Sequence, residues 1–427
     1  MSVFRAYKTE LDPNKGQWSA LYSHAGAARW AYNTGLAVEQ RYYDETGHGL
    51  GHFRLNKLLT TWKQHPANSW TYEVSNYCFQ SALKDLTCAL QNFFAGRARY
   101  PRFKSRATGA NRFRLYGKIK VEGRKVRLPV LGSVATKERN YLPSDSKIVS
   151  ATVSERAGRW FVSLQVEELS PNTATASGEA IGVDLGLKVL AAVSDGRVYD
   201  APKALVKHQN NMARLQRKLA RRVKGSKRRQ AAKVAVARLH LRITNIRANA
   251  IHEMTSDLVG VGLSAGQRPA AIVIEDLAVS NMMKNHHLAQ SIADASWAEV
   301  RRQLTYKCEW WGVELIVAPR FFASSKTCSV CGEVKAELSL RERTYKCAAC
   351  GAVIDRDLNA ARTLMGLAGK APDNENGRGG ECAGLAVTCA AKPAPAKRLS
   401  EMLSVAPAER QDSSHVGGEP ICASASA

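Results

Sequence analysis

The stretch 181-IGVDLGLK-188 decides the fold, because it places one acid, Asp184, within an otherwise apolar strand. The apolar segment 189–193 and the turn pair Asp195-Gly196 follow it, which predicts a second strand entering a hairpin. A carboxylate inside an apolar strand is costly to desolvate unless something compensates its charge. The segment therefore predicts the start of an α/β unit that carries a candidate site on its first strand.

Two further acids lie beside predicted core elements. The segment 270-AAIVIEDL-277 is typical of a buried strand and ends in Glu275, and 355-DRDLNAARTL-364 predicts a helix with Asp357 in its first turn. Three such acids suggest that one bound cation group neutralises all of their charges, and Mg²⁺ prefers carboxylate oxygen as a ligand. Two ions about 3.5–4 Å apart can activate a water and stabilise the leaving 3′ oxygen of a phosphodiester. We hypothesise that Asp184, Glu275 and Asp357 hold two Mg²⁺ ions; spacing alone leaves structural acids as an equal alternative.

Each of the two later acids has an acidic neighbour. Asp355 lies where a helix N-cap is expected, a position that Asp favours for structural reasons. Asp276 is expected to point to the opposite face of the strand from Glu275. Both neighbours remain weaker candidate ligands.

Four cysteines have the spacing of a zinc site. Cys328 and Cys331 form one C-x-x-C pair, Cys347 and Cys350 form the second after 15 intervening residues, and a glycine follows each pair. Four thiolates complete a tetrahedral site without an open position, so we expect one structural Zn²⁺. The alternative is four free buried cysteines. The other six cysteines show no ligand spacing.

The positive charge is concentrated in two segments. The 427-residue chain has a net charge of +25. Residues 203–247 hold 15 Lys and Arg without an acid, residues 97–139 hold 14 with two acids, and the other 339 residues hold 33 bases and 35 acids. Basic runs of this length favour a polyanionic partner over a merely solvated face. A membrane surface fits less well, because no dense Trp/Phe face accompanies the charge.

The acid-free segment predicts a helical hairpin that turns at Gly225-Ser226. Its apolar seams are expected at Met212, Leu215, Leu219, Val223, Val236, Leu239, Ile243 and Ile246. Its candidate phosphate-binding residues are Arg217, Lys218, Arg221, Arg222, Lys224, Lys227, Arg228 and Arg229.

The segment 100-YPRFKSR-106 interleaves aromatic and basic residues. We expect its side chains to stack on bases and pair with phosphates, with a strand that buries its aromatics as an equal alternative. The candidates are Tyr100, Arg102, Phe103, Lys104 and Arg106.

Composition divides the chain further. Residues 1–14 and 97–169 predict a small β domain whose first strand covers Val3–Lys8, and residues 15–96 predict a helical insert with a helix over Tyr72–Phe94 and Phe93 and Phe94 in its core. Residues 170–180 predict a linker, and residues 371–427, which lack Phe, Trp and Tyr, predict a disordered tail. No membrane span or secretion signal is expected, which favours a cytoplasmic protein.

Several motifs together resemble the TnpB family encoded by insertion sequences. They are IGVDLGLK, IVIEDL, SIADASWAEVRRQLTYKCEWWG, SSKTCSVCG, CAACG and DRDLNAARTL, with YPRFKSR and RWAYNTGL, and the resemblance spans roughly residues 1–365. The one mild departure is SSK at 324–326, where the family often has Thr-Ser-Gln.

The resemblance implies an α/β multidomain protein. It has a β-barrel wedge domain with a helical recognition insert, then a RuvC-type, RNase H-like nuclease domain over 181–322 and 352–370, interrupted by a zinc-ribbon lobe at 323–351. It also implies an RNA-guided DNA endonuclease related to type V CRISPR effectors, with a guide RNA from the element's end and a double-stranded target beside a short motif. The family's catalytic acids fall on Asp184, Glu275 and Asp357, the last because x-Asn-Ala-Ala follows it.

Three other functions stay open. A nuclease-inactive relative acts as an RNA-guided repressor, but its mark is loss of the acids. A DNA-joining transposase uses a related fold, although its acids normally run Asp, Asp, Glu. A zinc-ribbon DNA-binding protein with purely structural acids is the third.

Overall fold

The computed structural model describes residues 2–107, 109, 111–143, 146–169, 175–339 and 341–369. The tail expected at 371–427 and residues 170–174 of the expected linker lie outside these ranges. The described residues divide into two compact units. One comprises 2–13, 117–127 and 133–369, and the other comprises 14–116 and 128–132. Among the helices of the described ranges, none is long and apolar enough to cross a bilayer.

The second unit is mainly helical. Its elements are α1 (Lys15–Thr46), α2 (Gly51–Gln64), the 3₁₀ helix η1 (Pro66–Glu73), α3 (Asn76–Phe94) and the strand β2 (Arg112–Leu115). Asn14 caps α1 by accepting a hydrogen bond from the Gln17 amide, and the Gln17 side chain accepts one from Asn14 in return. The single helix expected over 72–94 is wrong at its start, because the chain extends at Val74 and Ser75 before α3 begins. Phe94 is also not a core residue: it is 62% exposed.

The N-terminal strands other than β2 form an antiparallel sheet, nearly all of which belongs to the first unit. They are β1 (Ser2–Asp12), β3 (Lys120–Glu122), β4 (Lys125–Leu128), β5 (Gly132–Thr136), β6 (Lys147–Glu155) and β7 (Trp160–Leu169), in the order β6-β7-β1-β5-β4-β3. The expected strand at Val3–Lys8 lies within β1, which pairs with β7 from Ser2 to Glu10. Alternate residues of β7, from Trp160 to Val166, are fully buried, as the period of a half-buried strand requires.

A second sheet of five strands follows. It consists of β8 (Ile181–Asp184), β9 (Val189–Val193), β10 (Val198–Asp200), β11 (Ala271–Ile274) and β12 (Glu314–Val317), in the order β10-β9-β8-β11-β12. The hairpin expected at Asp195-Gly196 joins the antiparallel pair β9 and β10. β11 lies parallel to both β8 and β12. The predicted α/β class is confirmed by this mixed sheet and the helices on its faces.

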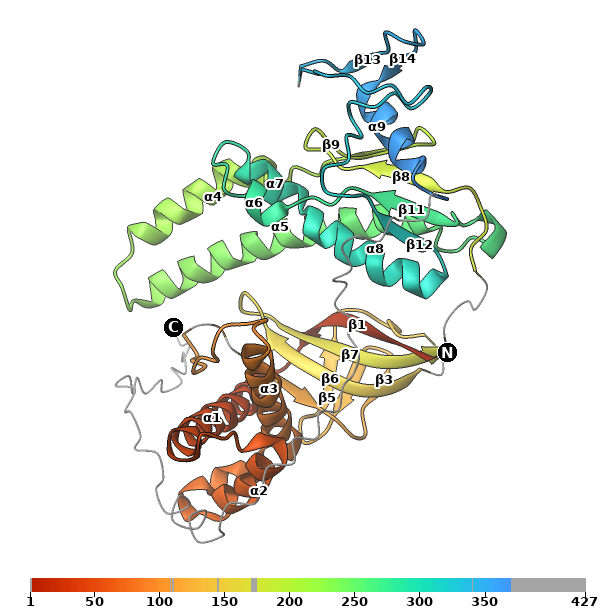
Figure 1. The fold of residues 1–427 in the computed structure, drawn as a ribbon. Helices are drawn as coiled ribbons and strands as arrows, with labels where there is room; N and C mark the ends of the chain where they lie inside the picture. The colour runs from red at the N-terminus through yellow and green to blue at the C-terminus, as the bar shows by residue number, and fades with distance from the viewer. Residues whose placement is uncertain are drawn as a thin grey trace. The chain divides into compact units, whose positions relative to one another are not determined.

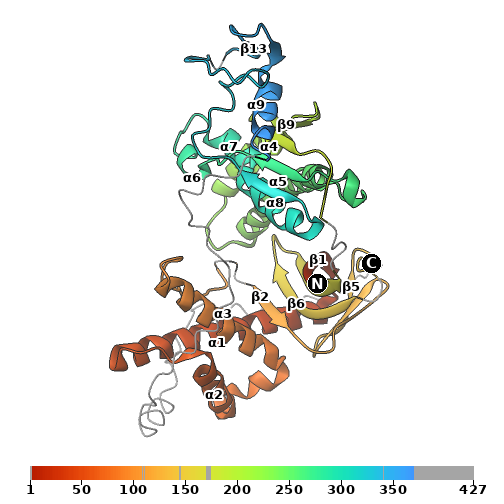
Figure 2. The same ribbon diagram turned by 45° about the vertical axis from the view of Figure 1, so that its right-hand side comes forward.

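Helices cover both faces of the five-stranded sheet (Figure 1). Ile181, Val183, Ile272 and Ile274 pack against α5 (Lys227–Val259) and α8 (Trp297–Trp311), whereas Val273 on the other face packs with Leu364 of α9 (Arg356–Met365). The remaining helices are α4 (Ala204–Ala220), η2 (Ala265–Gln267), α6 (Val279–Met282) and α7 (Ala289–Ala295). The view in Figure 2 also places α9 and α8 on different sides of the sheet.

Residues 176–178, expected in the linker, belong to this α/β layer instead. Ala176 is 4% exposed within the core cluster, and its amide donates to the Gly312 carbonyl at 2.9 Å. Gly178 exchanges backbone hydrogen bonds with Arg268 and Ala270. The small residues that predicted a linker allow close backbone pairing here.

Candidate functional site

Two of the three predicted acids lie side by side on the α9 face of the sheet. Val183 pairs with Ile274 in parallel register, so Asp184 and Glu275 each follow a paired residue on adjacent strands. Because Val183 and Ile274 point to the α5 and α8 face, the alternation of a strand directs Asp184 and Glu275 to the other face. Asp357 lies in the first turn of α9, which covers that same face. The fold therefore brings all three candidates to one region from distant parts of the sequence.

The approach of α9 to the sheet depends on Gly182. A Cβ atom built on Gly182 would lie 2.0 Å from the Ala361 carbonyl oxygen and 2.5 Å from the Met365 amide nitrogen, both in the α9 backbone. Ala360 and Ala361 face inward with no exposed surface. Small residues on both elements thus let the helix rest directly on β8, two residues before Asp184.

We expect Gly182→Ala to displace α9 and to disturb the site. The added methyl group would clash with the backbone of α9, which can shift only if the whole helix moves. We therefore expect the free energy of unfolding to fall by about 3 kcal/mol or more. Thermal unfolding of the purified variant measures the loss. Gly266→Ala is the matched control, because a methyl group added at Gly266 would have no heavy atom of another segment within 4 Å. Equal stability of the two variants would contradict the close approach.

The carboxylates repel one another. Burial, followed by the charges of Glu275 and Asp357, raises the pKa of Asp184 from 3.8 to about 8. A divalent cation would relieve this repulsion, so the donor set fits hard metal ions. In the described ranges, the cysteines are the one group of at least three His, Cys, Asp or Glu residues placed to hold a metal ion, with ligand atoms within 4.8 Å of one another; the three carboxylates are not such a group.

The acidic neighbours have other partners. Asp355 caps α9 as expected, accepting hydrogen bonds from the Asp357 and Leu358 amides at 3.0 and 3.2 Å. Asp276 accepts from Arg301 at 2.6 Å and from Arg320 at 2.8 Å. Burial acts to raise the pKa of Asp276, but the hydrogen bonds from the two guanidinium groups lower it overall. These contacts give both neighbours structural roles.

Ser324 is a site residue whose contact sequence reasoning missed. Its hydroxyl donates to a carboxylate oxygen of Glu275, and its side chain is buried. The only signal was its place in the SSK segment before the first cysteine pair. The hydrogen bond orients Glu275 from the loop that leads towards the cysteines.

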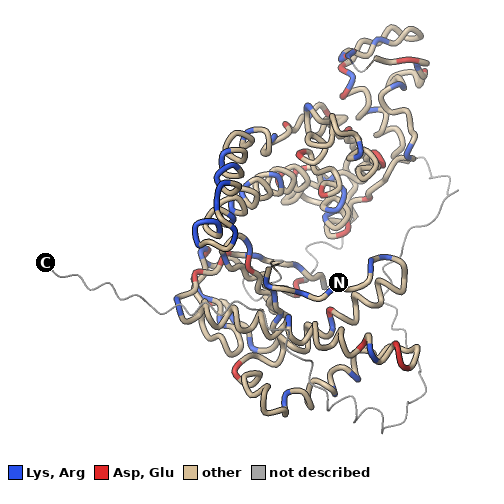
Figure 3. Tube along the Cα trace, turned by 90° about the vertical axis from the view of Figure 1, so that its left-hand side faces the viewer, with Lys and Arg blue, Asp and Glu red and all other residues tan. Residues whose placement is uncertain are grey.

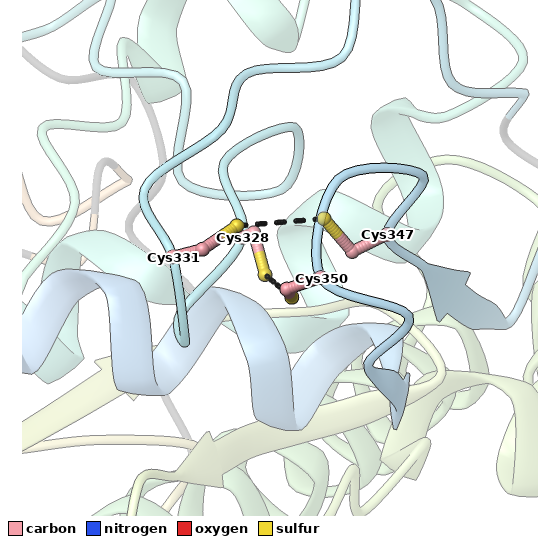
Figure 4. Close-up of side chains that lie close together, drawn as sticks. All are labelled: Cys328, Cys331, Cys347 and Cys350. Carbon is pink, nitrogen blue, oxygen red and sulfur yellow. Dashed lines mark hydrogen bonds between the residues drawn. The ribbon is translucent and has the colours of Figure 1, made fainter.

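The four predicted cysteines meet at one point (Figure 4). Their sulfurs lie within 4.8 Å of one another, with Cys328 3.7 Å from Cys350 and Cys331 3.5 Å from Cys347. A backbone hydrogen bond from Cys350 is the main cause that lowers the pKa of the Cys347 thiol, whereas hydrogen bonds with the neighbouring thiols raise the pKa values of Cys331 and Cys350. A metal ion bound by all four would take them as thiolates. This is a candidate four-thiolate metal centre.

The cysteine segment is tied to α9. Besides the cysteine loops it contains the hairpin of β13 (Thr344–Lys346) and β14 (Val353–Asp355). The fully buried Asn359 of α9 donates to the Thr327 carbonyl at 2.7 Å and accepts from the Ser329 amide at 2.9 Å. Thr363 also donates to the Thr327 carbonyl. Asn359 therefore connects the first cysteine loop to the helix that carries Asp357.

The basic helical hairpin has the predicted form. α4 and α5 turn at Gly225-Ser226, and their seam includes Met212, Leu239 and Ile243. Val223 is wrong as a seam residue, because it lies in the turn and is 77% exposed. Figure 3 shows Lys and Arg gathered on this hairpin. One hollow is lined by basic side chains alone: Arg214, Arg217, Lys218, Arg221 and Arg222.

One of the basic residues predicted to bind phosphate is already bound within the protein. Arg229 donates to the Leu219 and Arg222 carbonyls at 2.9 and 2.7 Å, so it closes the C-terminal end of α4. Lys224, Lys227 and Arg228 lie around the turn. The exposed Lys and Arg side chains of the helical hairpin remain candidates for nucleic-acid contact.

Residues 100–106 do not form a strand, so the buried-strand alternative is wrong. Tyr100 and Phe103 are 37% and 56% exposed, and Arg102 and Arg106 are exposed. Lys104 is held by the fold instead: its ammonium lies 3.5 Å from the Tyr32 ring centre, and its backbone exchanges hydrogen bonds with Asn33. Burial lowers the pKa of Lys104.

Three family models match the chain. One described as "Probable transposase", of the IS605 OrfB type, covers residues 151–286, and one described as "Cas12f1-like, TNB domain" covers 297–364. A third, described as "Helix-turn-helix domain" of IS605 OrfB, covers residues 1–48. In the structure that last region is the strand β1 followed by the long helix α1.

Several known proteins and structures are similar to this chain. A "Putative RNA-guided DNA endonuclease" of Streptomyces pristinaespiralis is 37% identical over 88% of this chain and 94% of its own length. A protein of the same description from Escherichia coli K12, InsQ, is 33% identical over 86% and 92%. The mini-RNA-guided endonuclease CRISPR-Cas_phi3 aligns with a TM-score of 0.44 at 8% identity, over 86% of this chain and 92% of that one. A Cas12f1–sgRNA–target DNA complex aligns with a TM-score of 0.33 at 15% identity, over 85% and 99%. The identity to the first two relatives, over most of both chains, establishes that this chain belongs to the TnpB family, the OrfB proteins of IS605-type insertion sequences.

Proposed function

We propose that the chain is an RNA-guided, Mg²⁺-dependent DNA endonuclease of the RuvC type. The convergence of Asp184, Glu275 and Asp357 on one face of the five-stranded sheet carries the proposal. The names of its relatives support guidance by RNA and cleavage of DNA.

The three acids have distinct supports within the site. Asp184 and Glu275 are positioned by adjacent strands, Ser324 orients Glu275, and Asp357 is positioned by the cap of α9. Two bound Mg²⁺ ions would supply an activated water and stabilise the leaving 3′ oxygen, giving 5′-phosphate and 3′-hydroxyl ends. The three carboxylates would bind the two ions. Asp276 is paired with Arg301 and Arg320 instead.

We also propose the assignment of parts. Residues 1–14 and 97–169 form the wedge domain, 15–96 the recognition insert, 181–322 and 352–370 the nuclease domain, and 323–351 a zinc-ribbon lobe with one structural Zn²⁺. The four sulfurs of the lobe offer a closed donor set, which supports a structural rather than a catalytic metal.

We propose that the exposed Lys and Arg side chains of the helical hairpin bind nucleic-acid phosphates. We expect Arg217→Gln, Lys218→Gln and Arg221→Gln together to reduce the slope of log affinity against log salt by about 2–3, because each lost phosphate contact releases about one counterion fewer. Titration of target DNA onto the RNA-loaded protein at several salt concentrations measures the slope. Lys147→Gln is the control, because its ammonium is paired with Glu167 at 2.8 Å. An unchanged slope would reject the hairpin assignment.

The proposed function is tested in two steps. RNA that co-purifies with the protein is sequenced, and a duplex matching that RNA is incubated with the complex in Mg²⁺ or in EDTA. We expect cuts only in matched duplex with Mg²⁺. Binding without cutting would favour the repressor alternative, and joined DNA ends would favour the transposase.

A further inference from the structure

Phe321 projects into solvent beside the proposed nuclease site. It is 93% exposed, the largest exposed fraction of any large apolar side chain in the described ranges. It lies in the loop that leads from β12 to the cysteine segment. Exposure of a single aromatic is ordinary on a protein surface, so its surroundings decide whether it has a role.

The loop around Phe321 is fixed on both sides. Arg320 is bound to Asp276, and Phe322 packs with Val273, Ala318 and Leu364 beneath the loop. The Phe322 amide donates to the Pro319 carbonyl at 2.9 Å, and the Ser324 amide donates to the Phe322 carbonyl at 2.9 Å. Two adjacent phenylalanines thus point in different directions: one anchors the loop, and the other is presented to solvent.

Phe321 and Glu275 line the same hollow. This cavity has a volume of about 440 Å³, and Asp276, Arg320 and Ser324 also line it. Its size suits a flat organic ring, and its wall combines one exposed aromatic ring with a proposed metal-binding acid. A ring placed beside an acid that would hold a metal ion at the reacting phosphate is positioned to meet the base of a neighbouring nucleotide.

We propose that Phe321 stacks on a nucleobase of the DNA strand entering the nuclease site, next to the phosphate that is cut. This inference rests on the proposed function and adds a positioning residue to it. Stacking does not distinguish strongly among bases, because every base has a π face. Phe321 thus holds an unpaired strand in register with Asp184, Glu275 and Asp357 without adding sequence preference.

The test compares Phe321→Ala, Phe321→Leu and Phe321→Tyr in single-turnover cleavage of matched target by the RNA-loaded protein. We expect the Ala and Leu variants to cut about 10- to 100-fold more slowly, the usual worth of one base–aromatic stack, and Tyr to retain the rate. Thermal unfolding is expected to be unchanged, because Phe321 buries little surface. Val198→Ala, an exposed apolar residue of β10 at the far edge of the sheet, is the control.

A photochemical cross-link detects direct contact between Phe321 and a DNA base, which a purely structural role of Phe321 would not produce. Target DNA carrying 5-iododeoxyuridine beside the cut position is bound to the Asp184→Asn protein and irradiated. We expect a photoproduct at Phe321, absent when Phe321 is Leu. A wild-type protein that cuts, with an Ala variant that cuts equally fast and no cross-link at Phe321, would overturn the stacking and leave the proposed function standing. A wild-type protein that does not cut would overturn the proposed function itself.

Discussion

Asp184→Asn is expected to abolish guide-dependent cleavage while leaving target binding intact. The substitution removes the central carboxylate of the proposed metal site but keeps its shape, so the rate is expected to fall at least about 10³-fold, or about 4 kcal/mol of transition-state stabilisation. Single-turnover cleavage and filter binding with the same RNA-loaded preparation measure the two properties. Simultaneous loss of binding would point to a structural acid.

Asp355 and Asp357 form a matched pair for the same experiment. Asp357→Asn is expected to abolish cleavage in the same way. Asp355→Ser removes a charge but keeps an oxygen that can cap α9, so it is expected to cut at nearly the wild-type rate. The reverse result would exchange the roles of the two acids.

The raised pKa of Asp184 gives the metal-free protein a characteristic pH dependence. The folded state holds a proton on Asp184 up to about pH 8, whereas the unfolded state releases it near pH 3.8. Between these values the folded state binds more protons, so the free energy of unfolding decreases as pH rises, by up to about 1.4 kcal/mol per pH unit from this group. Asp184→Asn removes this contribution.

Unfolding in EDTA at pH 6 and pH 7.5 tests this sign. We expect the variant to gain stability relative to the wild type as pH rises, and Mg²⁺ to stabilise the wild type more than the variant, since a bound ion favours the folded state. A wild type and a variant with the same pH dependence would mean that Asp184 is neither buried nor held among repelling charges.

The local sequence predicted those parts of the site whose chemistry differs from their surroundings. A simple hydrophobic core explains none of three features: Asp184 in an apolar strand, the two C-x-x-C pairs, and an acid in the first turn of a helix. The turn residues Gly225-Ser226 and Asp195-Gly196 likewise indicate hairpins, because few residues suit a tight turn.

The features that sequence could not predict depend on contacts between distant segments. Gly182 resembles any strand glycine until α9 is laid across it, and Asp276 is an ordinary acid until Arg301 and Arg320 reach it. Helical spacing placed Phe94 in a core, but its position at the last residue of α3 leaves it exposed. Periodicity describes one element, whereas burial depends on what covers it.

Loss of the proposed Zn²⁺ from the four-cysteine centre is expected to remove the proposed cleavage activity as completely as loss of a proposed catalytic acid. Cys347→Ser deletes one thiolate, and structural zinc contributes about 10–16 kcal/mol of apparent folding free energy in small zinc domains. We expect zinc content, measured by elemental analysis, to fall from one equivalent towards zero and the cysteine segment to lose its fold. Cys88→Ser, which changes an exposed cysteine of α3, is the control and should keep both zinc and cleavage.

Asn359 separates the loss of zinc from the loss of its connection to the acids. Asn359→Ala leaves all four thiolates but removes the hydrogen bonds to Thr327 and Ser329. If the cysteine centre acts by holding α9, and Asp357 with it, this variant will keep its zinc and cut poorly. If it instead cuts at the wild-type rate while Cys347→Ser does not, the proposed zinc lobe contributes by contacting the nucleic acid itself. The position of Asp357 is then secured by the packing of α9 on Gly182 and by the remaining hydrogen bond from Thr363 to the Thr327 carbonyl.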